Sequence, residues 1–127
     1  MQTDSMSTPR SRNLLIVDDD GPILRALTAR FEHADYSVTP ATNASIALSQ
    51  LDEASPDAAI LDINMPGLDG FRLANELKKK APECQCFFLT ASKSRDHHAQ
   101  AAAMNVQVID KPFDARELLQ IIENACG

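Results

Sequence analysis

The chain has 127 residues, of which 44% are hydrophobic and 24% are charged, and its formal net charge is −6. These are the values of one ordinary globular domain that can form a core without disulfides or structural metals. The acidic balance argues against a nucleic-acid surface, where a basic patch is expected. We find neither a membrane-length apolar run nor a signal peptide, so we expect a cytoplasmic domain with no membrane contact.

Residues 1–12 are polar and rich in Ser and Thr, and they predict a disordered leader or a remnant of cloning. From Asn13 onward, strand and helix patterns alternate five times. Pro40 cannot donate a hydrogen bond to a neighbouring strand, so its strand belongs at an edge of the sheet. The strands are short apolar runs, expected at Leu14–Val17, Tyr36–Pro40, Ala58–Leu61, Cys86–Leu89 and Val106–Ile109.

The segments between the strands carry apolar residues at helical spacing. Gly21-Pro22 opens the first helix, and Asn43 can cap the second. The third helix ends in the run Lys78–Lys80, where positive charge is favourable. The last two helices are expected at Ser92–Met104 and Asp114–Asn124, the latter with Leu118, Leu119, Ile121 and Ile122 facing inward. Strands separated by helices predict right-handed crossovers and a parallel five-stranded α/β sheet.

The cysteines and two adjacent histidines have plain structural interpretations. Cys84, Cys86 and Cys126 are odd in number and lack the spacing of a zinc site. Cys84 and Cys86 alternate along a strand, so we expect both on one face, as reduced thiols rather than a disulfide. His97 and His98 point about 100° apart on a helix. We expect them on a solvated face and not as a metal pair or a phosphorylated histidine.

Polar side chains follow four of the five predicted strands, at the point where each strand ends. They are Asp18-Asp19, Asp62, Thr90 and Lys111. In an open parallel sheet these ends share one edge, where ligands bind. Carboxylates that lie so close raise one another's pKa unless a cation offsets their charge, and Mg²⁺ prefers such oxygen ligands. We therefore predict a phosphoryl-transfer site with a divalent metal held by Asp19 and Asp62, by Asp18 directly or through water, and by the backbone carbonyl of Asn64.

Asp62 precedes a tight loop, Met-Pro-Gly-Leu-Asp-Gly, and an exposed carboxylate there can attack phosphorus. Lys111 and the Thr90 hydroxyl can then offset charge on the phosphoryl oxygens. Each residue also has a plainer interpretation. The run Asp18–Asp20 can be favourable charge at a helix N-terminus, Thr90 a strand-end cap, and Lys111 a surface lysine. Their coincidence at the strand ends favours the phosphoryl-transfer site.

The chain closely resembles the receiver domain of two-component response regulators. The resemblance runs from about Asn13 to Ala125 and is carried by LLIVDDD, AAILDINMPGLDGF, FFLTA and IDKPF. It implies a flavodoxin-like, doubly wound (βα)5 domain over residues 13–125 with strand order 2-1-3-4-5. It also implies roles for six residues: Asp62 as phosphoacceptor, Asp18, Asp19 and the carbonyl of Asn64 as further ligands of Mg²⁺ or Mn²⁺, and Thr90 and Lys111 as contacts of the phosphoryl group.

The same resemblance implies partners and limits. We expect the phosphoryl donor to be a sensor histidine kinase or a histidine phosphotransfer protein, the output partner to be one that the sequence does not identify, and the chain to be a monomer or weak dimer. The resemblance also implies a signalling phosphoacceptor with slow self-dephosphorylation that is not primarily an enzyme. Val108 departs from the Tyr or Phe that is common at its position, and Met104-Asn105 replaces a common Gly-Ala pair, although Asn105 tolerates a left-handed turn.

Two other functions are compatible with parts of this pattern. A degenerate receiver would act only as a protein-binding module, which the complete set of acidic, Thr and Lys residues disfavours. A dehalogenase-type phosphatase also uses an Asp nucleophile, but it needs a second Asp two residues later. Asn64 occupies that position here.

Overall fold

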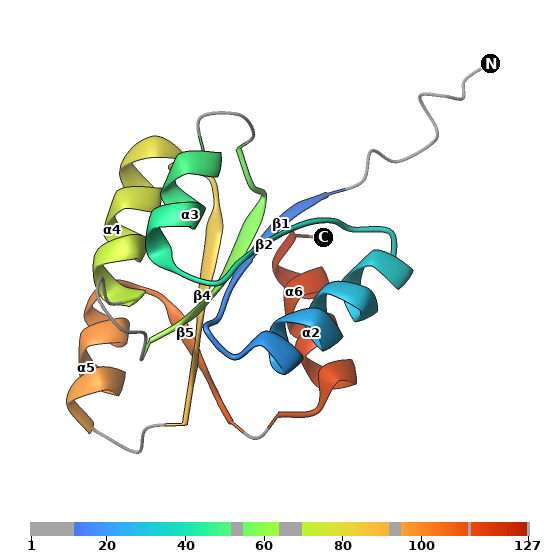
Figure 1. The fold of residues 1–127 in the computed structure, drawn as a ribbon. Coiled ribbons are helices and arrows are strands. Elements are labelled where there is room, and N and C mark those ends of the chain that lie inside the picture. The colour runs from blue at the N-terminus through green and yellow to red at the C-terminus, as the bar shows by residue number, and fades with distance from the viewer. Residues whose placement is uncertain (1–11, 52–54, 64–69, 92–94, 112, 127) are drawn as a thin grey trace.

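The computed structural model describes residues 12–51, 55–63, 70–91, 95–111 and 113–126. Within these ranges five strands and five helices alternate along the chain (Figure 1). The strands are β1 (Asn13–Val17), β2 (Ser37–Ala41), β3 (Ala58–Asp62), β4 (Gln85–Thr90) and β5 (Gln107–Asp110). The helices are α2 (Gly21–His33), α3 (Ala44–Gln50), α4 (Gly70–Lys80), α5 (Arg95–Ala103) and α6 (Ala115–Cys126). No described helix is both long and apolar enough to cross a membrane.

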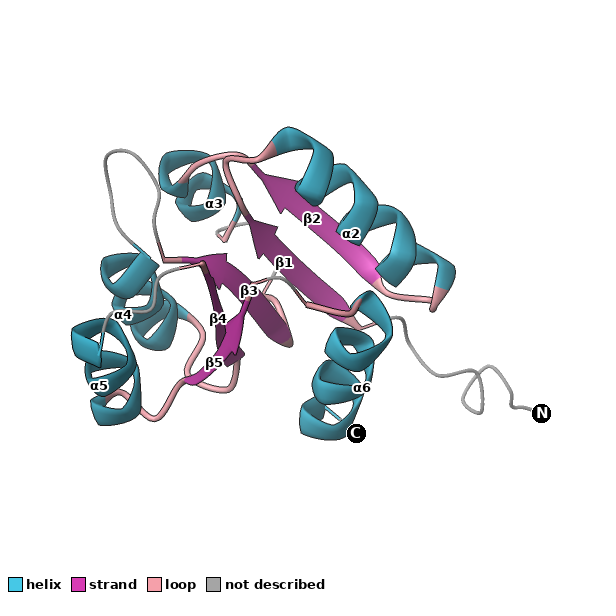
Figure 2. Ribbon diagram, turned by 90° about the horizontal axis from the view of Figure 1, so that it is seen from below, coloured by secondary structure: helices cyan, strands magenta, loops and turns pink. Residues whose placement is uncertain are grey.

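All neighbouring strands are parallel, and their order is β2-β1-β3-β4-β5. Helices α2 and α6 cover one face of the sheet, and α3, α4 and α5 cover the other (Figure 2). The predicted fold and strand order are confirmed. Pro40 lies on the edge strand β2, as predicted, and β2 and β5 begin one residue later than the apolar runs suggested.

The core lies on both faces of the sheet because side chains alternate along each strand. On β1, Leu14 and Ile16 pack with residues of α2 and α6, whereas Leu15 and Val17 pack with residues of α3 and α4. Strand β3 is buried along its whole length. This two-sided burial explains why the central strands are continuous apolar runs and not alternating patterns.

Capping residues fix where the first two helices begin. Asp20 accepts a hydrogen bond from the Ile23 N–H at 3.1 Å at the start of α2, and Asn43 accepts one from the Ile46 N–H at 2.9 Å at the start of α3. The prediction for Asn43 is confirmed. Pro22 lies in the first turn of α2, where its missing N–H is harmless.

Several local predictions can be compared directly with the structure. Asn105 has a φ of 59°, so the left-handed turn between α5 and β5 is confirmed. Cys84 and Cys86 are free thiols on the same face of the sheet, also as predicted. On α6, Leu118 and Ile122 are fully buried, but Leu119 and Ile121 are only partly buried at the margin of the core.

The expectation of a solvated face was wrong for His97, which is half-buried, whereas the side chain of His98 remains 40% exposed. The ring of His97 packs on Phe71 of α4 with a centroid distance of 5.7 Å. Its Nδ1 atom is buried without a hydrogen-bond partner among the described residues. His98 contacts Asp110 of β5 at 3.1 Å. Both histidines therefore contact neighbours of α5, His97 from a half-buried position and His98 at the surface.

Candidate functional site

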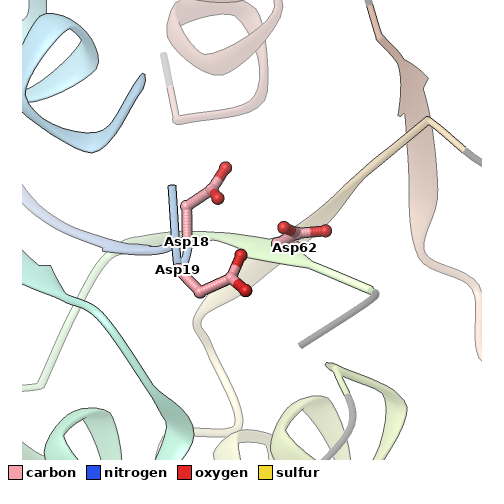
Figure 3. Close-up of side chains that lie close together, drawn as sticks. All are labelled: Asp18, Asp19 and Asp62. Atoms are coloured by element: carbon pink, nitrogen blue, oxygen red, sulfur yellow. The ribbon is translucent and has the colours of Figure 1, made fainter. Parts of the chain in front are cut away.

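Three carboxylates gather at the carboxyl ends of two central strands. Val17 and Leu61 are paired between β1 and β3, so the residues that follow them lie side by side. One ligand atom from each of Asp18, Asp19 and Asp62 lies within 4.8 Å of the other two (Figure 3). Asp18 and Asp62 are buried, and Asp19 is exposed. The predicted convergence of these carboxylates is therefore present in the structure.

The three residues of the acidic run after β1, Asp18–Asp20, make different contacts. Asp18 has no exposed surface, its N–H donates to the Ala41 carbonyl at 3.1 Å, and its Oδ1 accepts from the Asp20 N–H at 2.9 Å. Asp20 caps α2, so the helix N-terminus explanation of the run holds for this residue. Asp18 and Asp19 instead each place a carboxylate oxygen within 4.8 Å of one from Asp62.

Lys111 brings a positive charge into the acidic cluster. Its Nζ lies 3.3 Å from Oδ2 of Asp18 and 3.5 Å from Oδ2 of Asp62. Burial alone would lower the pKa of Lys111, but the carboxylates of Asp62 and Asp18 outweigh that effect and raise its pKa. The ammonium group is therefore charged at neutral pH and bridges the two buried carboxylates.

Thr90 ends β4 with no exposed surface. It is paired with Asp110 of β5, and its carbonyl oxygen accepts a hydrogen bond from the Lys111 N–H at 2.7 Å. The strand ends that carry Thr90 and Lys111 are thus fastened together. Asn64, the predicted carbonyl ligand, lies outside the described residues. Val108 is half-buried and packs against the core on the α4 side of the sheet.

Gly70 was not among the residues that the sequence singled out. It begins α4, and its N–H donates to the Ile63 carbonyl at 3.3 Å. A Cβ at this position would lie 2.7 Å from the carbonyl oxygen of Asp62. Only glycine permits this approach of two backbones. The signal in the sequence was the glycine that closes the loop sequence Met-Pro-Gly-Leu-Asp-Gly.

The donor set suits a hard divalent cation. Three carboxylates face one ammonium group among the described residues, which leaves an excess of negative charge at the edge of the sheet. All three acidic ligands are oxygen donors, the type that Mg²⁺ and Mn²⁺ prefer. The exposed position of Asp19 leaves the cluster accessible from solvent.

Comparison with known proteins gives a consistent family. The profile of the response regulator receiver domain matches residues 14–123. The response regulator SaeR of Staphylococcus aureus is 33% identical over 113 residues, which cover 88% of this chain and 49% of SaeR. The chain therefore spans about half the length of the curated relatives that it matches.

Solved structures agree with this family. A CheY-like receiver domain protein from Methanospirillum hungatei is 26% identical, with a TM-score of 0.87 over 91% of this chain and 94% of the other. The receiver domain of an HD domain-containing protein from Pseudomonas fluorescens is also 26% identical, with a TM-score of 0.85 over 91% and 94% of the two chains. This chain belongs to the response regulator receiver domain family of two-component signalling systems.

Proposed function

We propose that this receiver domain accepts a phosphoryl group on Asp62 and signals through the surface that changes as a result. The observation that supports this role best is the position of Lys111, whose ammonium group lies 3.3 Å from Asp18 and 3.5 Å from Asp62. A fixed cation beside an accessible cluster of carboxylates can offset the charge of an incoming phosphoryl group. Receiver domains of response regulators are phosphorylated by histidine kinases.

In the proposed step, a carboxylate oxygen of Asp62 forms a bond to phosphorus while the bond between phosphorus and the donor's imidazole nitrogen breaks. The bonding electrons leave with the imidazole, so the group is transferred without oxidation or reduction. Lys111 contacts one phosphoryl oxygen, and the Thr90 hydroxyl contacts another. The buried end of β3 keeps Asp62 aligned, which contributes to the rate because alignment replaces a random encounter.

Asp18, Asp19 and Asp62 would hold the divalent metal, with the backbone carbonyl of Asn64 as a further ligand. A bound Mg²⁺ or Mn²⁺ ion would supply positive charge toward the phosphoryl group. The protein's own contribution is to hold these carboxylates close together: Lys111 contacts Asp18 and Asp62, and the Asp20 N–H donates to Asp18.

The proposed phosphoryl donors are a sensor histidine kinase and a histidine phosphotransfer protein. Small phosphodonors such as acetyl phosphate are expected to serve as well, since the site itself supplies the alignment and charge. We further propose that the chain is a monomer or weak dimer that turns over its own phosphoryl group slowly, and that its role is signalling and not metabolism.

The test is the intact mass of the chain after incubation with acetyl phosphate, with Mg²⁺ or with EDTA. We expect the wild type to gain one phosphoryl group only with Mg²⁺, and Asp62→Asn to gain none. Asp35→Asn is the matched control, because it removes an exposed carboxylate from the turn after α2. Labelling of Asp62→Asn would overturn the assignment of the phosphoacceptor.

Two other outcomes correspond to the alternative functions. A wild-type chain that takes no label from acetyl phosphate or from phosphohistidine donors would act by binding alone. Steady hydrolysis of a phosphate monoester, such as p-nitrophenyl phosphate, would instead identify a phosphatase. Either result would replace the proposal.

A further inference from the structure

Helix α5 has little apolar contact with the rest of the domain. Of its nine residues, Ala101 is the only one that is buried, and much of the remainder is alanine or polar. By contrast, α4 buries five of its residues against the sheet. Because burial of apolar surface is the main stabilising term for packing, polar contacts weigh more for α5 than for the other helices.

Two adjacent histidines, His97 and His98, connect α5 to its neighbours. His97 packs its ring on Phe71 of α4, at a centroid distance of 5.7 Å. His98 reaches in another direction, and its Nε2 lies 3.1 Å from Oδ1 of Asp110 on β5. The side chains of this pair are 40% and 65% exposed, respectively, so the contact lies at the surface.

Asp110 occupies a particular place relative to the phosphoacceptor site. It is the last residue of β5, it is paired with Thr90 of β4, and it directly precedes Lys111. Lys111 contacts Asp18 and Asp62, whereas Asp110 contacts α5. Lys111, which contacts Asp62, and Asp110, which contacts α5, are therefore adjacent in the chain.

We propose that His98 is a positioning residue that couples helix α5 to the state of Asp62. The inference rests on the proposed phosphorylation of Asp62. A phosphoryl group adds negative charge next to the ammonium of Lys111 and changes the position that this side chain favours. Because Lys111 and Asp110 are adjacent, the change reaches Asp110, and the contact with His98 passes it to α5. Val108 on the same strand is aliphatic and offers α5 no polar contact of this kind.

The size of the effect follows from the exposure of the pair. Contacts between exposed charged groups are weak, and their loss changes an equilibrium by a factor of about 1.4 to 5. Loss of the His98 contact should therefore speed hydrogen exchange of the α5 amides by about that factor, since local opening of a poorly packed helix limits their protection.

The experiment is hydrogen–deuterium exchange of α5, read by mass spectrometry, without donor and with excess acetyl phosphate and Mg²⁺. The variants are His98→Ala, Asp110→Asn and His98→Lys, and the control is His33→Ala, which removes an exposed histidine at the end of α2. The intact mass of each sample reports its phosphorylation at the same time.

Without donor, we expect α5 to exchange about 1.4 to 5 times faster in His98→Ala and Asp110→Asn, and at the wild-type rate in His33→Ala. With donor, the wild type should change its α5 exchange, and the first two variants should lose at least half of that change at equal phosphorylation. His98→Lys should restore it, because the lysine ammonium can donate to the Asp110 carboxylate in place of the imidazole.

The proposal is wrong if His98→Ala responds to phosphorylation as the wild type does, or if phosphorylated wild type shows unchanged exchange in α5. A wild-type chain that gains no mass contradicts the proposed function instead. In that case the coupling proposal is also wrong, and the exchange rates without donor still show whether His98 attaches α5 to β5.

Discussion

The backbone of Gly70 lies directly against that of Asp62: a Cβ on residue 70 would be 2.7 Å from the Asp62 carbonyl oxygen and 2.9 Å from the Cα of Ile63. The first residue of α4 therefore rests on the backbone that carries the proposed phosphoacceptor. The hydrogen bond from the Gly70 N–H to the Ile63 carbonyl, at 3.3 Å, holds the two segments together. Any side chain at position 70 must displace one of them.

Gly70→Ala should destabilise the domain and slow its phosphorylation. The added methyl group meets backbone atoms, which cannot rotate away, so we expect a loss of about 1–3 kcal/mol in the free energy of unfolding. Urea denaturation measures this loss, and the rate of mass gain with acetyl phosphate measures the displacement of Asp62. Gly21→Ala is the control, because its Cβ would meet the flexible end of Arg25 at 3.2 Å. Equal stability of wild type and Gly70→Ala would contradict the prediction.

Mg²⁺ should stabilise the folded chain through the three carboxylates. A ligand that binds only the folded state adds about 2.7 kcal/mol at a concentration of 100 times its Kd. We expect the melting temperature to rise with Mg²⁺ in the wild type and in Asp35→Asn, and to rise much less in Asp19→Asn. Without Mg²⁺, Asp19→Asn should be no less stable than the wild type, because it relieves repulsion among the carboxylates. An unchanged Mg²⁺ response in Asp19→Asn would remove this residue from the metal site.

The Lys111 ammonium should stabilise the folded state at neutral pH, and this stabilisation should disappear only well above about pH 10. Its pKa is raised in the folded state by the carboxylates of Asp62 and Asp18, despite the opposing effect of burial. A group whose pKa is higher when folded stabilises the fold fully below its unfolded pKa, about 10.4 for lysine, and this stabilisation disappears as the pH rises through the folded pKa.

The measurement is the free energy of unfolding of wild type and Lys111→Met between pH 6 and 11. We expect Lys111→Met to be less stable, by a margin that is constant to about pH 10 and then narrows. Added Mg²⁺ should reduce the margin at pH 7, because the metal replaces the missing positive charge. A margin that narrows already between pH 7 and 9 would show that the carboxylates do not raise the pKa of Lys111.

The turn between α5 and β5 should tolerate only residues that adopt positive φ. Asn105 has a φ of 59°, a conformation that costs a β-branched residue about 1–2 kcal/mol or more. Asn105→Val should therefore lower the free energy of unfolding by that amount, whereas Asn105→Gly should leave it within about 1 kcal/mol of wild type. Gln107→Val, at an exposed strand position two residues later, is the control for the added β-branched side chain. Thermal unfolding of the three variants decides the matter.

The sequence predicted the sheet and the polar cluster because both depend on short-range patterns. A short apolar run such as Leu14–Val17, set between helical patterns, favours a strand buried on both faces, and in a parallel sheet the residue that follows it lies at the carboxyl edge. The positions of Asp18, Asp62 and Lys111 follow from strand order alone. Their mutual distances needed the structure, because side-chain directions beyond the strand ends are not set by periodicity.

Contacts between segments far apart in the chain were not predictable in the same way. The glycine at position 70 signals a close approach, but the sequence does not identify Asp62 as the neighbour, because this approach depends on how α4 crosses β3. The solvated position expected for His97 was wrong for a similar reason. An alanine-rich helix has no strong apolar stripe, so its sequence does not show which side faces the sheet.

The position of Pro40 affects how readily the edge of this sheet can pair with other chains. The Ser37 N–H and the Ala41 carbonyl face inward, so the alternation along β2 directs the position of Pro40 outward. There the proline withholds a donor from any strand that approaches this edge. The opposite edge, β5, is only four residues long and ends in the charged Asp110. Both edges of the sheet therefore disfavour the strand-by-strand addition of other chains that leads to aggregates.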